Sequence, residues 1–198
     1  MLVRSGIMKF LTDFADQAVV LPVVAAVAIV LFAQGWRRGA LVWLGVVSAT
    51  FAAVLVLKLA FQACGPVFGP WDLQSPSGHT AAASVVVGGF VALSEGTPLA
   101  ALAASVLAAV LIGSSRVELG FHSLPEVLIG AAVGIAGALV LSRLSGRPEI
   151  ARPIVLLAVA VAVAVLVHGT RLHAEDQIRW FARGLLDFVP ACRDAGPS

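Results

Sequence analysis

Charged residues are scarce in this sequence of 198 residues. Asp, Glu, Lys and Arg make up 12% of it, which is about half of the fraction found in a typical soluble domain. Hydrophobic residues make up 60%, and the mean hydropathy is +1.00. These values exclude an ordinary soluble domain and predict an integral membrane protein. The formal net charge is only +2, without an acidic or basic run, so nucleic acid is not expected as a partner.

The sequence also has little cysteine and no evident secretory signal. Only Cys64 and Cys192 are present; they do not suggest a disulfide framework, and we expect two free thiols. The first long apolar run is followed by Arg37 and Arg38 rather than by a small-residue cleavage site, so we expect it to be retained as a span. The length fits one domain, and we expect residues 1–198 to form a single membrane-embedded domain.

Long apolar runs fill most of the chain, and a helix needs about 20 apolar residues to cross a bilayer. Six runs approach that length: 17–34, 39–60, 79–95, 97–114, 124–143 and 153–169. Val-rich parts are expected to be helical, because backbone groups in hydrocarbon must be satisfied within the segment. Small residues such as Gly130 and Gly134 would let neighbouring helices approach closely. The sequence therefore predicts an all-α, polytopic transmembrane bundle of about six spans.

Two end segments are amphipathic rather than fully apolar. Apolar residues recur at helical spacing from Ile7 to Phe14 and again from Ile178 to Phe188. Each segment is expected to form a helix that lies in the membrane interface or packs against the bundle. The tail after Pro190 is expected to be disordered.

Lys58 is one of only two lysines, and it lies at the end of the second apolar run. An ionisable residue near membrane depth is costly, which makes it a functional candidate. The alternative is a lysine whose amine reaches out to the interface. With six spans, the connections at residues 61–77 and 115–123 fall on the same membrane face, so their polar residues can meet.

The third span opens with Pro76-Ser77-Gly78-His79. Ser77 is well placed as a helix N-cap, and the free N–H groups of a helix N-terminus can bind an anion such as phosphate. His79 would then lie in the first turn, beside the bound anion. The alternative is an ordinary capped helix start with an interfacial histidine.

The connection at 115–123 contains Arg116 and His122, and Glu126 follows. The planar guanidinium of Arg116 matches phosphate oxygens. His122 and Glu126 are four residues apart and share a helix face, so the carboxylate could orient the ring and make its other nitrogen a better nucleophile. Alternatively, Glu126 completes a capping box with Ser123.

Two histidines and two cations thus gather on one face. Apart from Lys58, His79, Arg116 and His122, no basic residue lies between positions 38 and 143. A convergent cationic site with two histidines suits phosphoryl transfer, in which positioning and charge neutralisation do most of the work.

At this point the sequence resembles the type 2 phosphatidic acid phosphatase (PAP2) superfamily, which carries three ordered motifs. These are Lys-x6-Arg-Pro, Pro-Ser-Gly-His and Ser-Arg-x5-His-x3-Asp. Here they read Lys58-x6-Gly65-Pro66, Pro76-Ser77-Gly78-His79 and Ser115-Arg116-x5-His122-x3-Glu126. The sequence departs from the pattern at Gly65, which removes one phosphate contact, and at Glu126, which keeps the carboxylate.

The resemblance implies a metal-independent lipid phosphatase with its motif core at residues 58–126. His122 would attack phosphorus and form a phosphohistidine, Glu126 would orient His122, and His79 would protonate the leaving oxygen. The implied phosphate-binding groups are Lys58, Ser77, the Gly78 backbone and Arg116. No cofactor is expected, and the sequence has no carboxylate cluster or zinc-ligand spacing. The implied substrate is a lipid phosphate such as phosphatidic acid or a polyprenyl diphosphate.

Two other functions stay open: a phosphotransferase that uses a lipid acceptor, and a catalytically weakened lipid-phosphate-binding protein, which Gly65 favours. The distribution of arginine predicts the orientation. The short connections opposite the site hold Arg37, Arg38, Arg143, Arg147 and Arg152. Positive residues favour the cytoplasmic side, so we expect a bacterial inner-membrane protein whose active site faces the periplasm or exterior. Arginines after residue 170 would then also lie outside.

Overall fold

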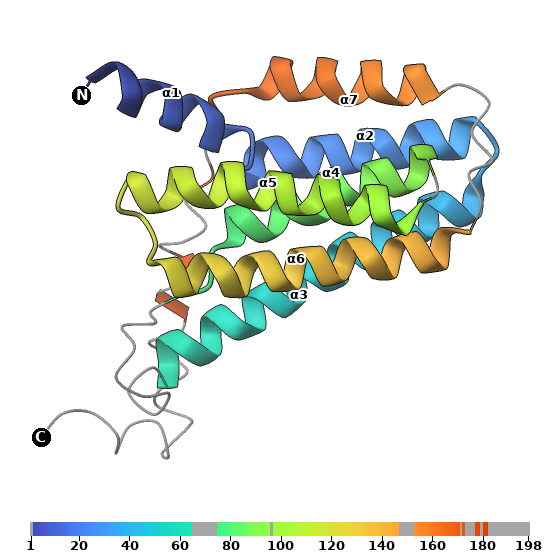
Figure 1. The fold of residues 1–198 in the computed structure, drawn as a ribbon. Coiled ribbons are helices and arrows are strands. Elements are labelled where there is room, and N and C mark those ends of the chain that lie inside the picture. The colour runs from blue at the N-terminus through green and yellow to red at the C-terminus, as the bar shows by residue number, and fades with distance from the viewer. Residues whose placement is uncertain are drawn as a thin grey trace, which may run out of the picture.

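In the computed structural model, α-helices account for most of the residues that the structure describes (Figure 1). The described residues are 2–64, 75–95, 97–146, 153–170, 172, 177–178 and 180–181. Within them the chain forms seven helices and no strand. The helices are α1 (Leu2–Asp13), α2 (Gln17–Ala33), α3 (Arg37–Cys64), α4 (Gly78–Glu95), α5 (Pro98–Glu118), α6 (Leu124–Ser145) and α7 (Pro153–Val167). The predicted all-α class is confirmed.

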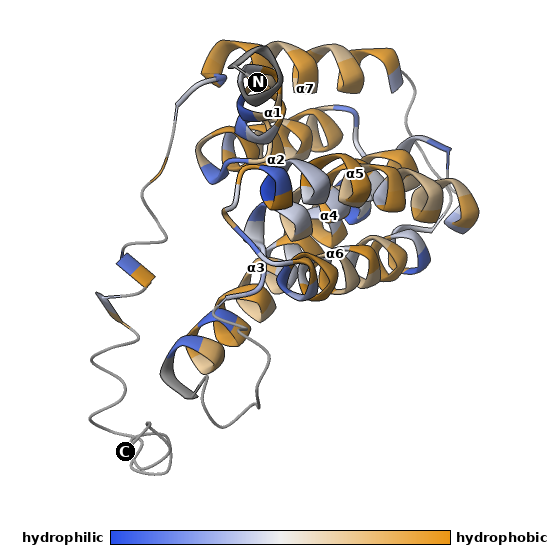
Figure 2. Ribbon diagram, turned by 60° about the vertical axis from the view of Figure 1, so that its left-hand side comes forward, coloured by the Kyte–Doolittle hydropathy of each residue, from blue (hydrophilic) through white to orange (hydrophobic). Residues whose placement is uncertain are grey.

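Helices α2 to α7 coincide with the six apolar runs, and α1 is the expected separate N-terminal helix. Over the described parts of the chain, four stretches are long and apolar enough to cross a membrane: Gly6–Ala33, Arg37–Gln62, Pro98–Glu118 and Leu124–Ser145. The apolar helix α7 is shorter, with 15 residues. Large apolar side chains such as Leu107, Leu128 and Leu166 point outward and are exposed. In Figure 2, hydrophobic residues (orange) extend along most of helices such as α5 and α7. These features fit a helical membrane protein.

The bundle is organised around α4, which packs against α2, α3, α5 and α6. Glycines allow these contacts. A Cβ at Gly130 of α6 would collide with the Ser77 carbonyl, and one at Gly134 would collide with the Ala81 carbonyl. The prediction that these two glycines serve close helix packing is therefore confirmed, and the contact brings the start of α6 against the start of α4.

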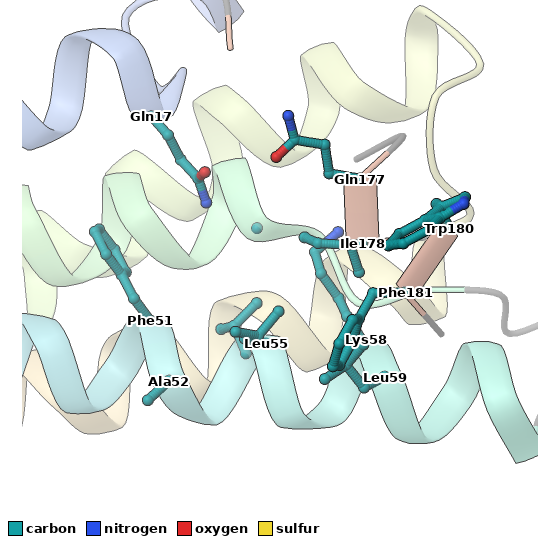
Figure 3. Close-up of a pocket in the computed structure, with 12 residues that line it drawn as sticks. Gln17, Phe51, Ala52, Leu55, Lys58, Leu59, Gln177, Ile178, Trp180 and Phe181 are labelled. Atoms are coloured by element: carbon teal, nitrogen blue, oxygen red, sulfur yellow. The ribbon is translucent and has the colours of Figure 1, made fainter. Parts of the chain in front are cut away.

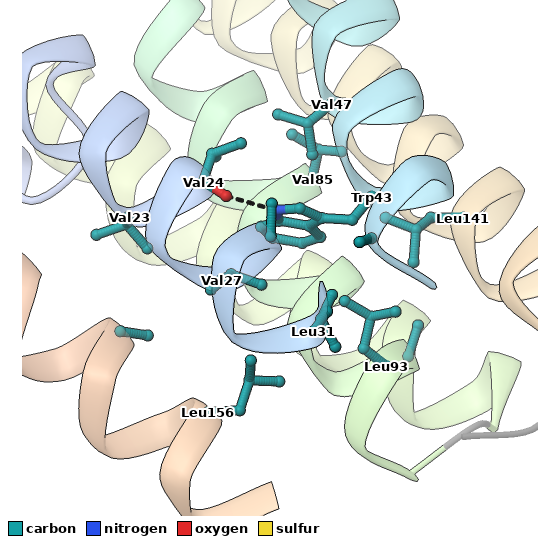
Figure 4. Packing of buried hydrophobic residues seen from close by; sticks show 14 of the residues in the cluster. Val23, Val24, Val27, Leu31, Trp43, Val47, Val85, Leu93, Leu141 and Leu156 are labelled. Atoms are coloured by element: carbon teal, nitrogen blue, oxygen red, sulfur yellow. Dashed lines mark hydrogen bonds between the residues drawn. The ribbon is translucent and has the colours of Figure 1, made fainter. Parts of the chain in front are cut away.

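The apolar core lies in the half of the bundle away from the α5–α6 connection. Trp43 is fully buried at its centre, and its indole Nε1–H donates to the Val24 carbonyl at 2.9 Å. Leu31, Leu93 and Leu141 surround it from α2, α4 and α6 (Figure 4). The opposite half contains the buried charged side chains Asp16, Lys58 and Glu126.

The end of α5 differs from its predicted position. Helix α5 continues to Glu118, so Ser115 and Arg116 lie in its last turn and not in the connection. The Ser115 hydroxyl donates to the Ile112 carbonyl at 2.7 Å, and an arginine is favourable near a helix C-terminus, so neither residue ends the helix. Most of the predicted helix at 178–188 and the tail after residue 190 lie outside the described residues.

Candidate active site

Three segments that are distant in sequence meet at the polar end of the bundle. They are the C-terminal part of α3 with Lys58, the start of α4 with residues 75–79, and residues 116–126, which run from the last turn of α5 into the first turn of α6. The meeting follows from the order of the helices: α3 ends and α4 begins at this end, and the two crossings of α4 and α5 return the chain to it. Residues that the three motifs predict to share one site therefore do come together.

Glu126 joins two of these segments. It is 5% exposed, and its Oε1 accepts a hydrogen bond from the Ser75 backbone N–H at 2.7 Å. Its Oε2 accepts from the Ser123 N–H at 3.0 Å and lies 3.1 Å from His122 Nδ1. The main chain adds a further link, because Ser77 N–H donates to the Glu126 carbonyl at 3.0 Å. Capping and histidine orientation, which the sequence offered as alternatives, are thus performed by the same side chain.

The contact with Glu126 defines the chemistry of His122. A carboxylate accepts a proton from the ring nitrogen that faces it, so Nδ1 carries the hydrogen and Nε2 keeps its lone pair. Burial of the ring lowers the pKa of His122 below its usual value. The contact with Glu126 opposes that shift, whereas the positive charges of Arg116 and Lys58 add to it. His122 is therefore neutral near pH 7, as a nucleophile must be.

Lys58 points into the protein and not out to the interface. It is 4% exposed, and its Nζ donates to the Ser75 hydroxyl at 2.9 Å. Its Cε would lie only 3.3 Å from a Cβ at position 78, so glycine leaves the room that the lysine side chain occupies. A buried ammonium costs free energy unless an anion or polar groups compensate it. The interfacial alternative for Lys58 is thus excluded.

Ser77 caps α4, as the sequence predicts. Its Oγ accepts from the Thr80 backbone N–H at 3.4 Å and from the Thr80 hydroxyl at 2.9 Å. His79 is the second residue of the helix, and its Nε2 lies 3.6 Å from the Oδ2 of Asp16. No motif had drawn attention to Asp16, which follows the first amphipathic segment and is the N-cap of α2. Its position as the N-cap of an apolar span, on the same face as the site, is the signal that could have identified it.

Arg116 is tied to the turn that carries His122. The N–H groups of Phe121 and His122 donate to the Arg116 carbonyl at 3.0 and 3.4 Å, and Gly120 supplies the positive φ of +71° that this turn requires. The Arg116 Cζ lies 4.4 Å from the centroid of the Phe121 ring, a cation–π distance. The turn therefore fixes the guanidinium and the candidate nucleophile relative to each other.

The structure also shows why the arginines near the start of α3 do not replace the missing motif arginine. Position 65 lies outside the described residues. Arg38 donates from Nη2 and Nε to the Leu144 carbonyl at 3.0 and 3.2 Å, at the other end of the bundle. Twenty helical residues separate it from Lys58, which corresponds to about 30 Å.

An apolar cavity of about 670 Å³ adjoins the site (Figure 3). Lys58 and Gly78 lie at its polar side, with two glutamines, Gln17 and Gln177. Its remaining walls come from one face of α3 and from a C-terminal segment: Phe51, Ala52, Val54, Leu55, Leu59, Ile178, Trp180 and Phe181. The volume lies within the usual range of small-molecule sites. A hydrocarbon group could therefore lie beside the cationic cluster.

Comparisons with known proteins agree with the arrangement of the motifs. The sequence profile of the PAP2 superfamily matches residues 39–150, which is more than half of the chain. An uncharacterized 22.5 kDa protein in the cps region of Klebsiella pneumoniae is 33% identical over 150 residues, or 71% of this chain and 72% of that protein. No solved structure matches. All the site residues predicted from the motifs lie within the matched range, whereas Asp16 precedes it.

Proposed function

The chain belongs to the PAP2 superfamily, whose members are in general phosphatases, and we propose that it hydrolyses the phosphate of a membrane lipid through a phosphohistidine at His122. The observation that carries this proposal is the buried His122–Glu126 pair, with His122 Nδ1 3.1 Å from the carboxylate. It leaves one neutral ring nitrogen available for attack, within the electrostatic influence of Lys58 and Arg116.

The reaction proceeds in two displacements. His122 Nε2 attacks phosphorus, the N–P bond forms, and the P–O bond to the lipid breaks while His79 gives a proton to the leaving oxygen. Water then attacks the phosphohistidine, His79 takes a proton from that water, and the N–P bond breaks to release phosphate. Lys58, Arg116, Ser77 and the backbone of Gly78 neutralise and position the phosphate oxygens, which supplies most of the rate in phosphoryl transfer.

A lipid substrate fits the surroundings of this site. The cavity beside Lys58 has mostly apolar walls, so a hydrocarbon chain can lie in it while the phosphate lies among the cations. The apolar exterior of the bundle would allow such a substrate to arrive from the bilayer. With the arginine-rich end at the cytoplasmic side, the site would face the periplasm of a bacterial inner membrane. We place all of residues 1–198 in this one domain.

The first test is phosphate release by the purified protein in lipid nanodiscs. Phosphatidic acid and a polyprenyl diphosphate would be supplied with EDTA present, and wild type would be compared with His122→Ala. His168→Ala is the matched control, because His168 packs against Phe10 and Phe14 and contacts the Phe10 carbonyl at 3.1 Å. We expect release by wild type and by the control, but not by His122→Ala.

The same assay separates the other two functions. Labelled phosphate that appears on a lipid acceptor and not as free phosphate would identify a phosphotransferase. If a folded wild type releases no phosphate from any lipid, the hydrolase proposal fails. Activity gained by Gly65→Arg would then identify a weakened relative that binds lipid phosphates.

A further inference from the structure

Asp16 is a buried carboxylate outside the three motifs, at the point where α1 gives way to α2. It is 7% exposed. Its Oδ1 accepts hydrogen bonds from the Ala18 N–H at 2.8 Å and from the Leu172 N–H at 3.1 Å. Backbone donors from both ends of the described chain thus fix this carboxylate, and its second oxygen, Oδ2, lies 3.6 Å from His79 Nε2.

Helix capping alone does not explain a carboxylate at this position. One oxygen is sufficient for a cap, and asparagine or serine caps a helix about as well as aspartate. A buried negative charge costs free energy unless a positive partner compensates it. The candidate for that partner is the imidazolium form of His79, whose Nε2 lies within ion-pair distance of Asp16 Oδ2.

His79 needs such a partner, because the other charged groups that act on it are cations. Burial of the ring disfavours its protonated form most, Arg116 from α5 and Lys58 from α3 disfavour it further, and Asp16 favours it. A general acid must carry its proton when the substrate is bound. In a site assembled to hold phosphate with cations, a carboxylate near the acid offsets their effect.

We propose that Asp16 is a positioning residue for proton transfer, holding His79 by Nε2 so that the Nδ1 proton is directed to the leaving oxygen. This proposal rests on the function proposed above. When the P–O bond breaks, the bonding pair stays on the leaving oxygen, which takes the Nδ1 proton. His79 becomes neutral and keeps its Nε2–H toward Asp16, which remains ionised. In the second step Nδ1 accepts a proton from the attacking water, and the imidazolium is restored.

This role predicts a dependence on the leaving group. An alkoxide leaves poorly without a proton, whereas p-nitrophenolate is stable as an anion. Asp16→Asn should therefore slow the hydrolysis of phosphatidic acid strongly and that of p-nitrophenyl phosphate little. General acid catalysis contributes about 10²–10⁴-fold, and we expect the variant to lose about 10- to 100-fold with the lipid and less than about threefold with the aryl ester.

The experiment compares wild type, Asp16→Asn, His79→Ala and Asp13→Asn with both substrates. Asparagine at 16 keeps an oxygen for Ala18 and Leu172, so the cap should survive, which thermal unfolding checks. Asp13→Asn removes the same charge one turn earlier and is the matched control. We expect Asp16→Asn to share the substrate selectivity of His79→Ala, with the basic limb of its kcat profile moved to lower pH, while Asp13→Asn behaves as wild type.

Two results would overturn the role of Asp16 alone: equal losses with both substrates, or wild-type kinetics with both. Equal losses together with a lowered unfolding temperature would make Asp16 only a structural cap. A wild type that releases no phosphate, or releases it equally well without His122, would instead overturn the proposed function and this inference with it. The two failures are therefore distinguishable within one set of measurements.

Discussion

Replacement of Glu126 by glutamine tests the centre of the site with the smallest change in shape. Both carboxylate oxygens are used: Oε1 by the Ser75 N–H, and Oε2 by the Ser123 N–H and His122 Nδ1. A glutamine side chain offers only one acceptor oxygen. If that oxygen stays with Ser75, the new amide N–H₂ faces two other donors, so the bonds to Ser123 and His122 are lost.

The size of the effect follows from the contact with His122. The ring becomes positively charged at Nδ1 as Nε2 bonds to phosphorus, so the carboxylate stabilises the transition state more than the free enzyme. A hydrogen bond to a charged group contributes about 1.5–3 kcal/mol. At about 1.36 kcal/mol per decade of rate, its loss lowers kcat by roughly 10- to 150-fold. The lost bond at the start of α6 costs about 1 kcal/mol of stability in addition.

The assay measures steady-state phosphate release and the amount of acid-labile phosphoenzyme trapped from ³²P-labelled substrate. Glu126→Gln should lower both, because formation of the phosphohistidine becomes slow. Glu126→Asp is the matched control: it keeps the charge and has the carboxylate of the superfamily motif, so it should retain more activity than the glutamine variant. A glutamine variant within threefold of wild type, or one more active than the aspartate variant, would refute the role given to Glu126.

Two further predictions follow from the same contacts. Gly130→Ala should destabilise the protein by about 1–3 kcal/mol and reduce kcat, because its Cβ would collide with the Ser77 carbonyl. Thermal unfolding and phosphate release measure these two effects. Gly45→Ala, whose Cβ would meet no atom within 4 Å, should leave both unchanged. The acid limb of the pH profile of kcat/KM, corrected for substrate ionisation, should have its midpoint below pH 6.5. Burial lowers the pKa of His122, so its neutral, nucleophilic form persists to lower pH. Glu126→Gln should move the midpoint lower still, and a midpoint above pH 6.5 would contradict this account.

The helices could be predicted from the sequence because the membrane leaves few alternatives. A run such as 124–143 must satisfy its own backbone groups in hydrocarbon, which only a helix does within one segment. Helix ends depend on weaker, local preferences. Hydropathy placed the end of α5 at residue 114, but the Ser115 hydroxyl finds a carbonyl within the helix and Arg116 suits its C-terminus, so the helix continues to Glu118.

The motif residues of the candidate site could be found because their spacing is local. His122 and Glu126 are one helical turn apart, and Ser77 and His79 share the start of one helix. Asp16 could not be found in this way, since its contact with His79 joins residues 63 positions apart and depends on how α2 packs beside α4. The double use of Glu126 was also beyond the sequence, because the donor from Ser75 comes from another segment.

The placement of the site also follows from how helices associate in lipid. Burial of apolar side chains between helices provides little driving force there, because lipid tails are equally apolar, so close packing and hydrogen bonds hold helices together. Gly130 lets α6 approach the Ser77 carbonyl, and one turn earlier in α6 Glu126 accepts the Ser75 N–H at 2.7 Å. Ser75 in turn accepts from Lys58 on α3. The contact at Gly130 thus contributes to the spacing between the candidate nucleophile and the proposed phosphate-binding residues, so a change that separates α4 from α6 should lower activity before it unfolds the apolar half around Trp43.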